Sequence, residues 1–524
     1  MRPTPVLGRR GFVDPKPKSL DRTDQSLIER PGRVAAGSGG SSVRWSAIAV
    51  IGRQLSQLLA ALVLARVLGP THYGVISAAT VYVTLTTLVL DQGMAAAVVQ
   101  RPVVTRTLPG AVATANLLTS CFLALVTVLA APAVATFFKA PDLTDLLRVL
   151  GAGLILKGFA ITPRAVQQRL LGFKKVAIAD VSGGVIGALA GVTAVLTGAG
   201  IWSMVVQVLL TDLVIAVVLV GFTRGTRPNL QLGELRSILP FSIRIFGSNA
   251  LAFLSRNSDN VLVGRFLGIG ALSLYSMAYR VLVIPVQMIG QTVNRVTFPI
   301  FSRLAEERDR LIASLLKVTE LLAFAAIPVM LLVAVGSREL VEAVLGREWA
   351  PTAPVLSVLA VAGARETVSS VNNSLMRAMG AGRLILRYEV LAALCQVGGI
   401  VVGLQFGLIG VAVGLTVAGF ALVPVQLFVQ RHLCGVRIRD LIGRVLAPVH
   451  ASIWGVAAYL LIRELANGVW LTVIVGGLGY AVIAVAVLLV FHRPALYRAL
   501  TAGREIFGGA PAPRPRRALA GVAS

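Results

Sequence analysis

Three arginines lie in the middle of long apolar segments, where a charged side chain is costly and therefore informative. Arg53, Arg256 and Arg280 each lie well inside such a segment, and only two acids, Asp91 and Asp259, are nearby. A charge in the hydrocarbon of a membrane costs at least about 2.5 kcal/mol, so such residues usually face a protein interior or a water-filled cavity. One positive charge is left unmatched. Because guanidinium groups fit phosphate oxygens well, we predict that these arginines bind an anionic ligand.

Polar side chains recur at helical spacing on the same segments. Thr80, Thr84, Thr87 and Asp91 are spaced by four, three and four residues, which places them on one helical face. Other such faces hold Arg53 with Gln57; Asn249, Arg256 and Asn260 with Asp259 beside them; and Ser276, Arg280, Gln287, Gln291 and Asn294. These faces favour a polar cavity. The alternative is that they satisfy one another across packed helices, and for the threonines alone bonding to their own helix is the preferred interpretation.

The elements that must position these residues are membrane-spanning helices. Of the 524 residues, 56% are hydrophobic and 14% are charged, whereas a soluble domain carries roughly a quarter charged residues. The apolar residues form runs of about 20, the length of a helix that crosses a bilayer. We predict about fourteen spans, at 43–68, 74–99, 108–131, 147–165, 176–197, 200–222, 239–267, 271–300, 312–335, 352–376, 384–405, 408–430, 445–463 and 468–491.

The loop charges give these spans a direction. The formal net charge is +26, and loops after even-numbered spans are basic, whereas the opposite loops hold few uncompensated charges. Because Lys and Arg concentrate in cytoplasmic loops, we predict that both termini are cytoplasmic. The charge then needs no nucleic-acid partner. Trp202, Trp349 and Trp470 fall at predicted outer edges, as expected for interfacial tryptophans.

The two halves of the span region resemble one another. Arg66-Val-Leu-Gly69 matches Arg265-Phe-Leu-Gly268 at an offset of 199, and the match extends to Ser77 and Ser276. Later matches have offsets of 208 and 209, including Gly198 with Gly407. An even number of spans per unit makes the repeats parallel. We therefore predict an all-α membrane protein with two parallel six-helix lobes around a central cavity, plus a C-terminal helix pair.

The predicted domain boundaries follow from the repeat. The N-lobe is expected at 43–236 (spans 1–6), the C-lobe at 237–435 (spans 7–12) and the helix pair at 436–495 (spans 13–14). Residues 1–42 and 496–524 are polar and basic and are predicted to be disordered cytoplasmic tails. The three cysteines and four histidines are scattered, so we predict no metal, no cofactor and no catalytic set.

Segments in the first two spans of each predicted lobe carry a family pattern. They are Arg66-Val-Leu-Gly-Pro-Thr-His-Tyr-Gly74, Asp91-Gln-Gly-Met-Ala-Ala-Ala-Val-Val-Gln-Arg101, Asp259-Asn-Val-Leu-Val-Gly-Arg265, and the stretch from Tyr275-Ser-Met-Ala-Tyr-Arg280 to Val296-Thr-Phe-Pro-Ile-Phe-Ser-Arg-Leu304. The chain resembles the Wzx-type polysaccharide flippases of the multidrug/oligosaccharidyl-lipid/polysaccharide exporter superfamily over residues 43–495. It departs from the family at Met94, where Leu is frequent.

The resemblance implies a transporter and not an enzyme. Such proteins have two lobes around a cavity lined by the first two helices of each lobe. By alternating access they carry an undecaprenyl-diphosphate-linked oligosaccharide from the inner to the outer leaflet of the bacterial cytoplasmic membrane, for exopolysaccharide, capsule or O-antigen biosynthesis. The implied partners are this lipid-linked oligosaccharide and membrane lipids, with a polysaccharide polymerase and chain-length regulators as further candidates.

The resemblance also assigns roles to the polar residues. Arg53, Arg256 and Arg280 become the candidates for holding the diphosphate, while Asp91 and Asp259 would orient those arginines or take part in ion coupling. The further cavity-lining candidates are Gln57, Thr84, Thr87, Asn249, Asn260, Gln287 and Gln291.

Two other functions are less well matched by the sequence. A drug or small-molecule antiporter of the same superfamily would more naturally have an acidic cavity, whereas this one is basic. A membrane polysaccharide polymerase or ligase needs a large outer loop, and the longest outer connections here, near 132–146 and 336–351, are only about 15 to 17 residues long.

Overall fold

The chain folds into long helices. The computed structural model describes residues 38–507 apart from 92, 101–103, 106 and 224–225, and within these ranges it contains helices and no strand. Ten described helices are long and apolar enough to cross a membrane. The all-helical membrane prediction is therefore confirmed. Most of the two predicted tails, 1–37 and 508–524, lies outside the described residues.

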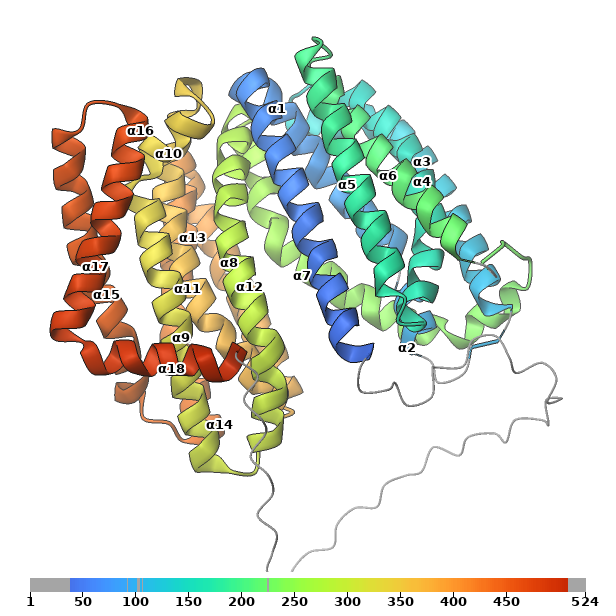
Figure 1. The fold of residues 1–524 in the computed structure, drawn as a ribbon. Helices are drawn as coiled ribbons and strands as arrows, with labels where there is room; N and C mark the ends of the chain where they lie inside the picture. Colours follow the sequence, from blue (N-terminus) through green and yellow to red (C-terminus); the bar gives the residue numbers. More distant parts are fainter. Residues whose placement is uncertain (1–37, 92, 101–103, 106, 224–225, 508–524) are drawn as a thin grey trace, which may run out of the picture.

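The first group of helices precedes residue 224. It comprises α1 (Ser38–Asp91), α2 (Met94–Gln100), α3 (Leu108–Phe138), α4 (Leu143–Arg169), α5 (Phe173–Leu196) and α6 (Trp202–Phe222). α3 packs on α4, α5 packs on α6, and α1 lies along α5 (Figure 1). Gly183, Gly187 and Gly191 of α5 face Thr211 and Gln207 of α6, which lets these two helices approach closely.

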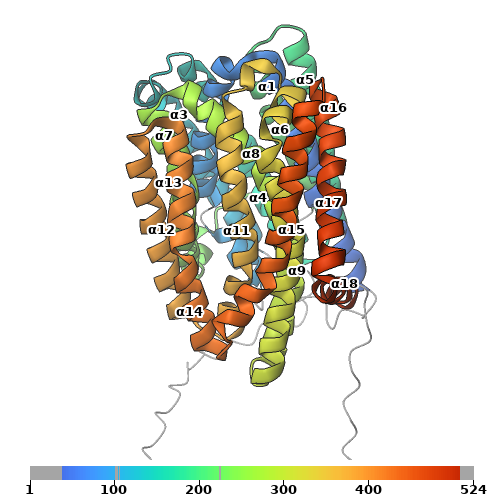
Figure 2. The same ribbon diagram turned by 90° about the vertical axis from the view of Figure 1, so that its left-hand side faces the viewer.

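The second group follows residue 226. It comprises η1 (Leu232–Ser237), α7 (Leu239–Phe266), α8 (Ile269–Leu304), α9 (Arg308–Val335), α10 (Ser337–Val344), η2 (Arg347–Trp349), α11 (Thr352–Ala378), α12 (Gly382–Leu404), α13 (Gly407–Ala421) and α14 (Val423–Cys434). α11 packs against α8, α9 and α13, and α12 packs on α13 at one edge (Figure 2). α7, α8 and α11 are not among the ten, although the described start of α8, Ile269–Val283, is a shorter apolar helix.

The last helices lie at the opposite edge of this group. They are α15 (Ile438–Leu465), α16 (Val469–Leu471), η3 (Thr472–Gly476), α17 (Gly477–Phe491) and α18 (Arg493–Phe507). The buried Tyr459 and Tyr480 of α15 and α17 pack with residues of α9, including Phe324 and Leu332. α15 and α17 therefore cover α9 from outside (Figure 1).

The first predicted span and most of the second form one kinked helix, α1, whereas the end of the second, from Met94, belongs to the separate helix α2. Gly69 interrupts α1 with φ 70° and ψ 173°, a conformation that glycine adopts without steric cost, and Pro70 follows it. Gly268, which the sequence repeat pairs with Gly69, has φ 88° and ψ 171° and separates α7 from α8. The two glycines that the predicted repeat pairs thus share one backbone conformation at a break between helical segments.

Most predicted spans lie within a few residues of an observed helix, but three features differ from the prediction. Span 12 is divided into α13 and α14 at Leu422, because Pro424 lacks the N–H needed to continue the helix. The tail predicted from residue 496 is helical as far as Phe507, because Ala495, Ala499 and Ala502 form a buried face. Trp349 is fully buried instead of interfacial, because its indole N–H donates to the carbonyl of Ala65 at 3.0 Å.

Candidate functional site

A cavity of about 520 Å³ lies between α1, α4, α6, α7 and α8. This volume is within the range of small-molecule sites, roughly 300–1,000 Å³. The polar residues that line it are Gln54, Gln57, Ser77, Thr80, Thr84, Lys157, Gln207, Thr211, Asp212, Asn257, Asn260, Ser276, Arg280 and Gln287. Both halves of the sequence contribute, so the cavity lies between the two helix groups.

Five of the predicted cavity residues line this space: Gln57, Thr84, Asn260, Arg280 and Gln287. Gln54 Nε2 donates to Gln287 Oε1 at 3.2 Å and connects α1 to α8 across one side. Asn249 is exposed and is not one of the lining residues. The side chains of Arg53, Asp91, Arg256 and Gln291 lie outside the described residues, so their roles stay predictions.

Of the three arginines predicted to bind an anion, Arg280 is the one whose side chain the structure describes. Its Nη1 donates to the phenol oxygen of Tyr73 at 3.1 Å, from α8 to α1. Among the described side chains, no carboxylate lies within ion-pair distance of it. A guanidinium has five N–H donors, so a single bond to a neutral phenol leaves donors and a full positive charge for a ligand.

Asp259 lies behind the cavity and is almost fully buried. Its carboxylate accepts hydrogen bonds from the Tyr275 hydroxyl at 2.9 Å and from the backbone and side-chain nitrogens of Asn260 at 2.8 and 3.2 Å. It therefore fixes Asn260, which does line the cavity, and it has no described ion pair with Arg280.

The threonine face of α1 is satisfied largely by its own helix. Thr80, Thr84 and Thr87 donate to the carbonyls of Ile76, Thr80 and Val83 at 2.7 to 2.8 Å. Their oxygens can still accept bonds, and Thr87 Oγ1 accepts one from Lys157 Nζ at 3.3 Å. Thr87 lies beside the cavity although it is not one of its lining residues.

The sequence did not predict an ion pair on the cavity wall that α4 and α6 form. Lys157 Nζ of α4 lies 3.6 Å from Asp212 Oδ2 of α6, with side chains only 21% and 15% exposed. Asp212 is recognisable in the sequence as an ionisable residue within a span, but nothing there connects it with a partner. The available signal for Lys157 is a single lysine inside the predicted span 147–165.

At one end, the two helix groups are held together beside the cavity. Arg66 of α1 donates to the carbonyls of Ala343 and Val344 at 3.1 and 3.0 Å, and Trp349 packs edge-on against Tyr73. Nearer the cavity, Ser276 Oγ donates to Ser77 Oγ at 2.8 Å. A Cβ at Gly74 would lie 2.4 Å from the carbonyl oxygen of Ile269, so this contact requires glycine.

Comparison with known families gives one match that covers more than half of the chain. Residues 63–354 match the family described as "Polysaccharide biosynthesis protein". This range begins within α1 and ends in α11, and it includes the other four helices around the cavity in full.

Several curated proteins are similar over most of their length. The chain is 26% identical to the lipopolysaccharide biosynthesis protein WzxC of Escherichia coli (strain K12), over 79% of this chain and 84% of the relative. It is 25% identical to the teichuronic acid biosynthesis protein TuaB of Bacillus subtilis (strain 168), over 67% and 73%. It is 26% identical to the succinoglycan biosynthesis transport protein ExoT of Rhizobium meliloti (strain 1021), over 69% and 74%.

Solved structures share the fold. The lipid II flippase MurJ in an inward closed conformation matches with a TM-score of 0.69 at 14% identity, covering 86% of this chain and 99% of that one. An inward-facing multidrug resistance transporter of the MATE family matches with a TM-score of 0.59 at 17% identity, covering 76% and 99%. At such identities the likeness concerns the fold alone.

Proposed function

Because the chain belongs to the polysaccharide biosynthesis protein family, we propose that it flips an undecaprenyl-diphosphate-linked oligosaccharide from the inner to the outer leaflet of the bacterial cytoplasmic membrane. The predicted membership among Wzx-type flippases is confirmed by this family match and these relatives. These similar proteins include a transport protein and a flippase, which agrees with the prediction of a transporter and not an enzyme.

The observation that carries the proposal is the position of Arg280. It lines a cavity between the two helix groups, and its only described polar partner is the neutral Tyr73. A diphosphate would supply the missing negative charge, and the amide and hydroxyl groups around it, such as Gln57, Asn260 and Gln287, suit a sugar. Arg53 and Arg256 are proposed to complete the basic surface.

We propose that residues 43–236 and 237–435 form two parallel lobes, each of six spans, with 436–495 as an additional helix pair. Ser77 and Ser276, which the repeat pairs, form a hydrogen bond with one another. Such a contact between equivalent residues is expected where a two-fold axis passes between two copies. The shared conformation of Gly69 and Gly268 supports the same arrangement.

Alternating access would then require the contacts beside Tyr73 to open. Arg66, Trp349 and Ser276 connect α1 to the second group, and their four hydrogen bonds must break before a ligand can leave at that end. With the predicted topology this is the outer end, and both termini are cytoplasmic. The state described here is therefore proposed to be closed toward the outside.

The proposal is tested by measuring flipping in proteoliposomes. They would contain the purified full chain and a lipid-linked oligosaccharide isolated from a strain that lacks its own transporter, and the readout is the glycan exposed to an added lectin. We expect exposure with the wild-type chain and none with Arg280→Gln, whereas Arg387→Gln, an exposed arginine of α12, should behave like wild type. Equal exposure with and without protein, together with efflux of a cationic dye, would favour the antiporter instead.

A further inference from the structure

The last described helix, α18, lies across the helix bundle and not along it. In Figure 1 it runs horizontally below α17 and in front of α9, and it contacts both helices. It follows α17 after a single residue, His492. Nothing in the proposed transport cycle uses this helix.

The two sides of α18 differ in character. Ala495, Ala499 and Ala502, at spacings of four and three, are buried and let the helix lie close to its neighbours. On the opposite side, Tyr497 and Leu500 are 64% and 55% exposed. Arg493 and Arg504 are exposed on that same side, and among the described residues neither has an ion-pair partner.

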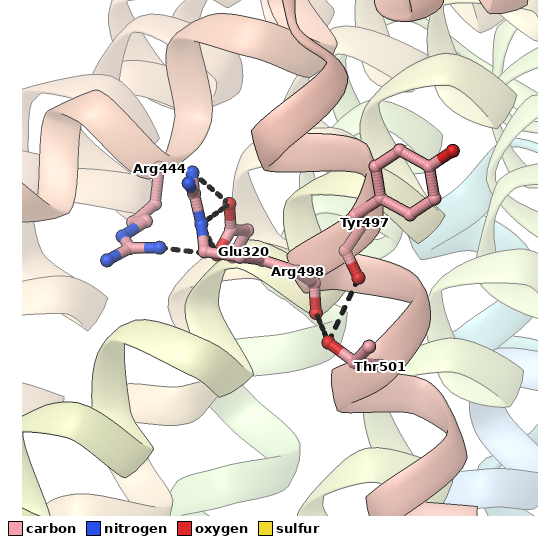
Figure 3. Close-up of polar contacts among 5 residues, drawn as sticks. All are labelled: Glu320, Arg444, Tyr497, Arg498 and Thr501. Atoms are coloured by element: carbon pink, nitrogen blue, oxygen red, sulfur yellow. Dashed lines mark hydrogen bonds and ion pairs between the residues drawn. The ribbon is translucent and has the colours of Figure 1, made fainter.

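A buried carboxylate clamps this helix to the bundle. Glu320 of α9, whose side chain is 3% exposed, accepts bonds from Arg444 Nη1 of α15 at 2.6 Å and from Arg498 Nη2 of α18 at 2.9 Å (Figure 3). Lys317, one turn earlier in α9, forms an ion pair with Glu505. The Tyr497 ring points away from this cluster (Figure 3). The orientation of α18 is thus fixed by charges on its inner side.

The neighbouring surface is apolar up to the end of α17. In α17, directly before α18, Val490 and Phe491 are 71% and 67% exposed, as expected for side chains that face lipid. The exposed surface becomes basic at Arg493, which begins α18. A helix that combines outward arginines with Tyr and Leu is typical of the membrane interface.

We infer that α18 lies in the headgroup layer of the membrane and that Arg493 and Arg504 bind the phosphates of anionic phospholipids. This inference rests on the proposed topology, which places α18 at the cytoplasmic surface. The two arginines are eleven residues apart, or about 16 Å along a helix, so they reach separate headgroups. The bond from Arg498 to Glu320 holds α18 in an orientation in which Arg493 and Arg504 can both reach lipid headgroups.

The test is native mass spectrometry of the purified full chain, titrated with phosphatidylglycerol or with phosphatidylcholine. We expect the wild type to prefer phosphatidylglycerol, and Arg493→Gln/Arg504→Gln to lose roughly tenfold of that preference, since each basic residue at a membrane surface contributes measurably. Arg383→Gln/Arg387→Gln removes the same charge from exposed positions of α12 and should change little.

Three results would overturn the inference. In the first, Arg493→Gln/Arg504→Gln keeps the wild-type preference for phosphatidylglycerol. In the second, the control Arg383→Gln/Arg387→Gln loses as much of this preference as the α18 variant. In the third, undecaprenyl phosphate displaces phosphatidylglycerol from the wild type, which would assign the site to the transported lipid. Because Glu320→Gln removes the clamp without touching either arginine, it should lower the preference as well. Flipping of the glycan is measured separately, so its failure would leave this result unchanged.

Discussion

Arg280 and Glu320 are both charged residues deep among apolar helices, but their surroundings differ. Glu320 accepts bonds from two guanidinium groups that come from α15 and α18. Arg280 donates to one neutral phenol and, among the described side chains, has no carboxylate within ion-pair distance. The first charge is neutralised within the protein, whereas the second is left for something else to neutralise.

The difference separates structure from function. A buried charge is tolerated when partners satisfy it, and removing one partner of such a group is strongly destabilising. A charge without a counter-ion stabilises nothing by itself and is retained where a ligand binds. Glu320 is therefore expected to determine stability and Arg280 to determine transport.

The largest expected effect is the loss of export in Arg280→Gln. Leaving the diphosphate without its charged donor should reduce export about 100-fold, since losing one partner of a buried charge pair costs about 2–5 kcal/mol. Arg280→Lys should restore part of it, because an ammonium offers charge without the guanidinium fork. The measurement is the amount of surface polysaccharide in cells that hold equal amounts of each protein in the membrane. Normal export by Arg280→Gln would exclude Arg280 as a residue that binds the diphosphate.

For Glu320→Gln, stability should change instead of transport. Two guanidinium groups lose their carboxylate, so the protein should be destabilised by about 3 kcal/mol. Thermal unfolding in detergent measures this, with the exposed Glu464→Gln as the control. Substrate binding per folded molecule should stay within about twofold. A lower affinity at an unchanged melting temperature would remove the distinction drawn above.

The pair of Lys157 and Asp212 lies between these two extremes. Lys157→Gln should weaken diphosphate binding about fivefold, and Asp212→Asn should strengthen it by a similar factor, because the neutral amide releases Lys157 to the ligand. The affinity of each purified variant for undecaprenyl diphosphate shows whether the two changes are opposite in direction. Changes in the same direction would mean that the pair is structural, as Glu320 is.

The smallest effect is expected for Thr84→Val. The hydroxyl of Thr84 donates to the carbonyl of Thr80, and that carbonyl still accepts a backbone N–H of its helix after the substitution, so no buried acceptor is left unsatisfied. Export should stay within about twofold of the wild type in the same cell assay. A larger loss would show that the threonine face binds the glycan directly.

The helices could be predicted because their signal is local. Apolar run lengths place α7 at 239–267 and α9 at 312–335, against observed bounds of Leu239–Phe266 and Arg308–Val335. α18 was overlooked because its alanine spacing lies within a sequence whose composition suggests disorder. Helical spacing also allowed the correct prediction that Gln57, Asn260, Arg280 and Gln287 line one cavity.

The partners of these residues could not be predicted, because they are distant in the sequence. Lys157 and Asp212 are 55 positions apart, and Trp349 reaches a carbonyl 284 positions away. Glu320 could not be assigned a role, since its two arginines come from helices that only the fold brings together. Spacing within one helix carries no information about such pairs.

The most direct test of the central claim is the binding of undecaprenyl diphosphate to the purified chain. The wild type and the Arg280→Gln, Glu320→Gln and Arg387→Gln variants would be compared by titration, with melting temperatures measured on the same samples. We predict that affinity falls about 100-fold for Arg280→Gln alone and that the melting temperature falls for Glu320→Gln alone. Unchanged affinity in Arg280→Gln would contradict the assignment of the cavity to an anionic headgroup.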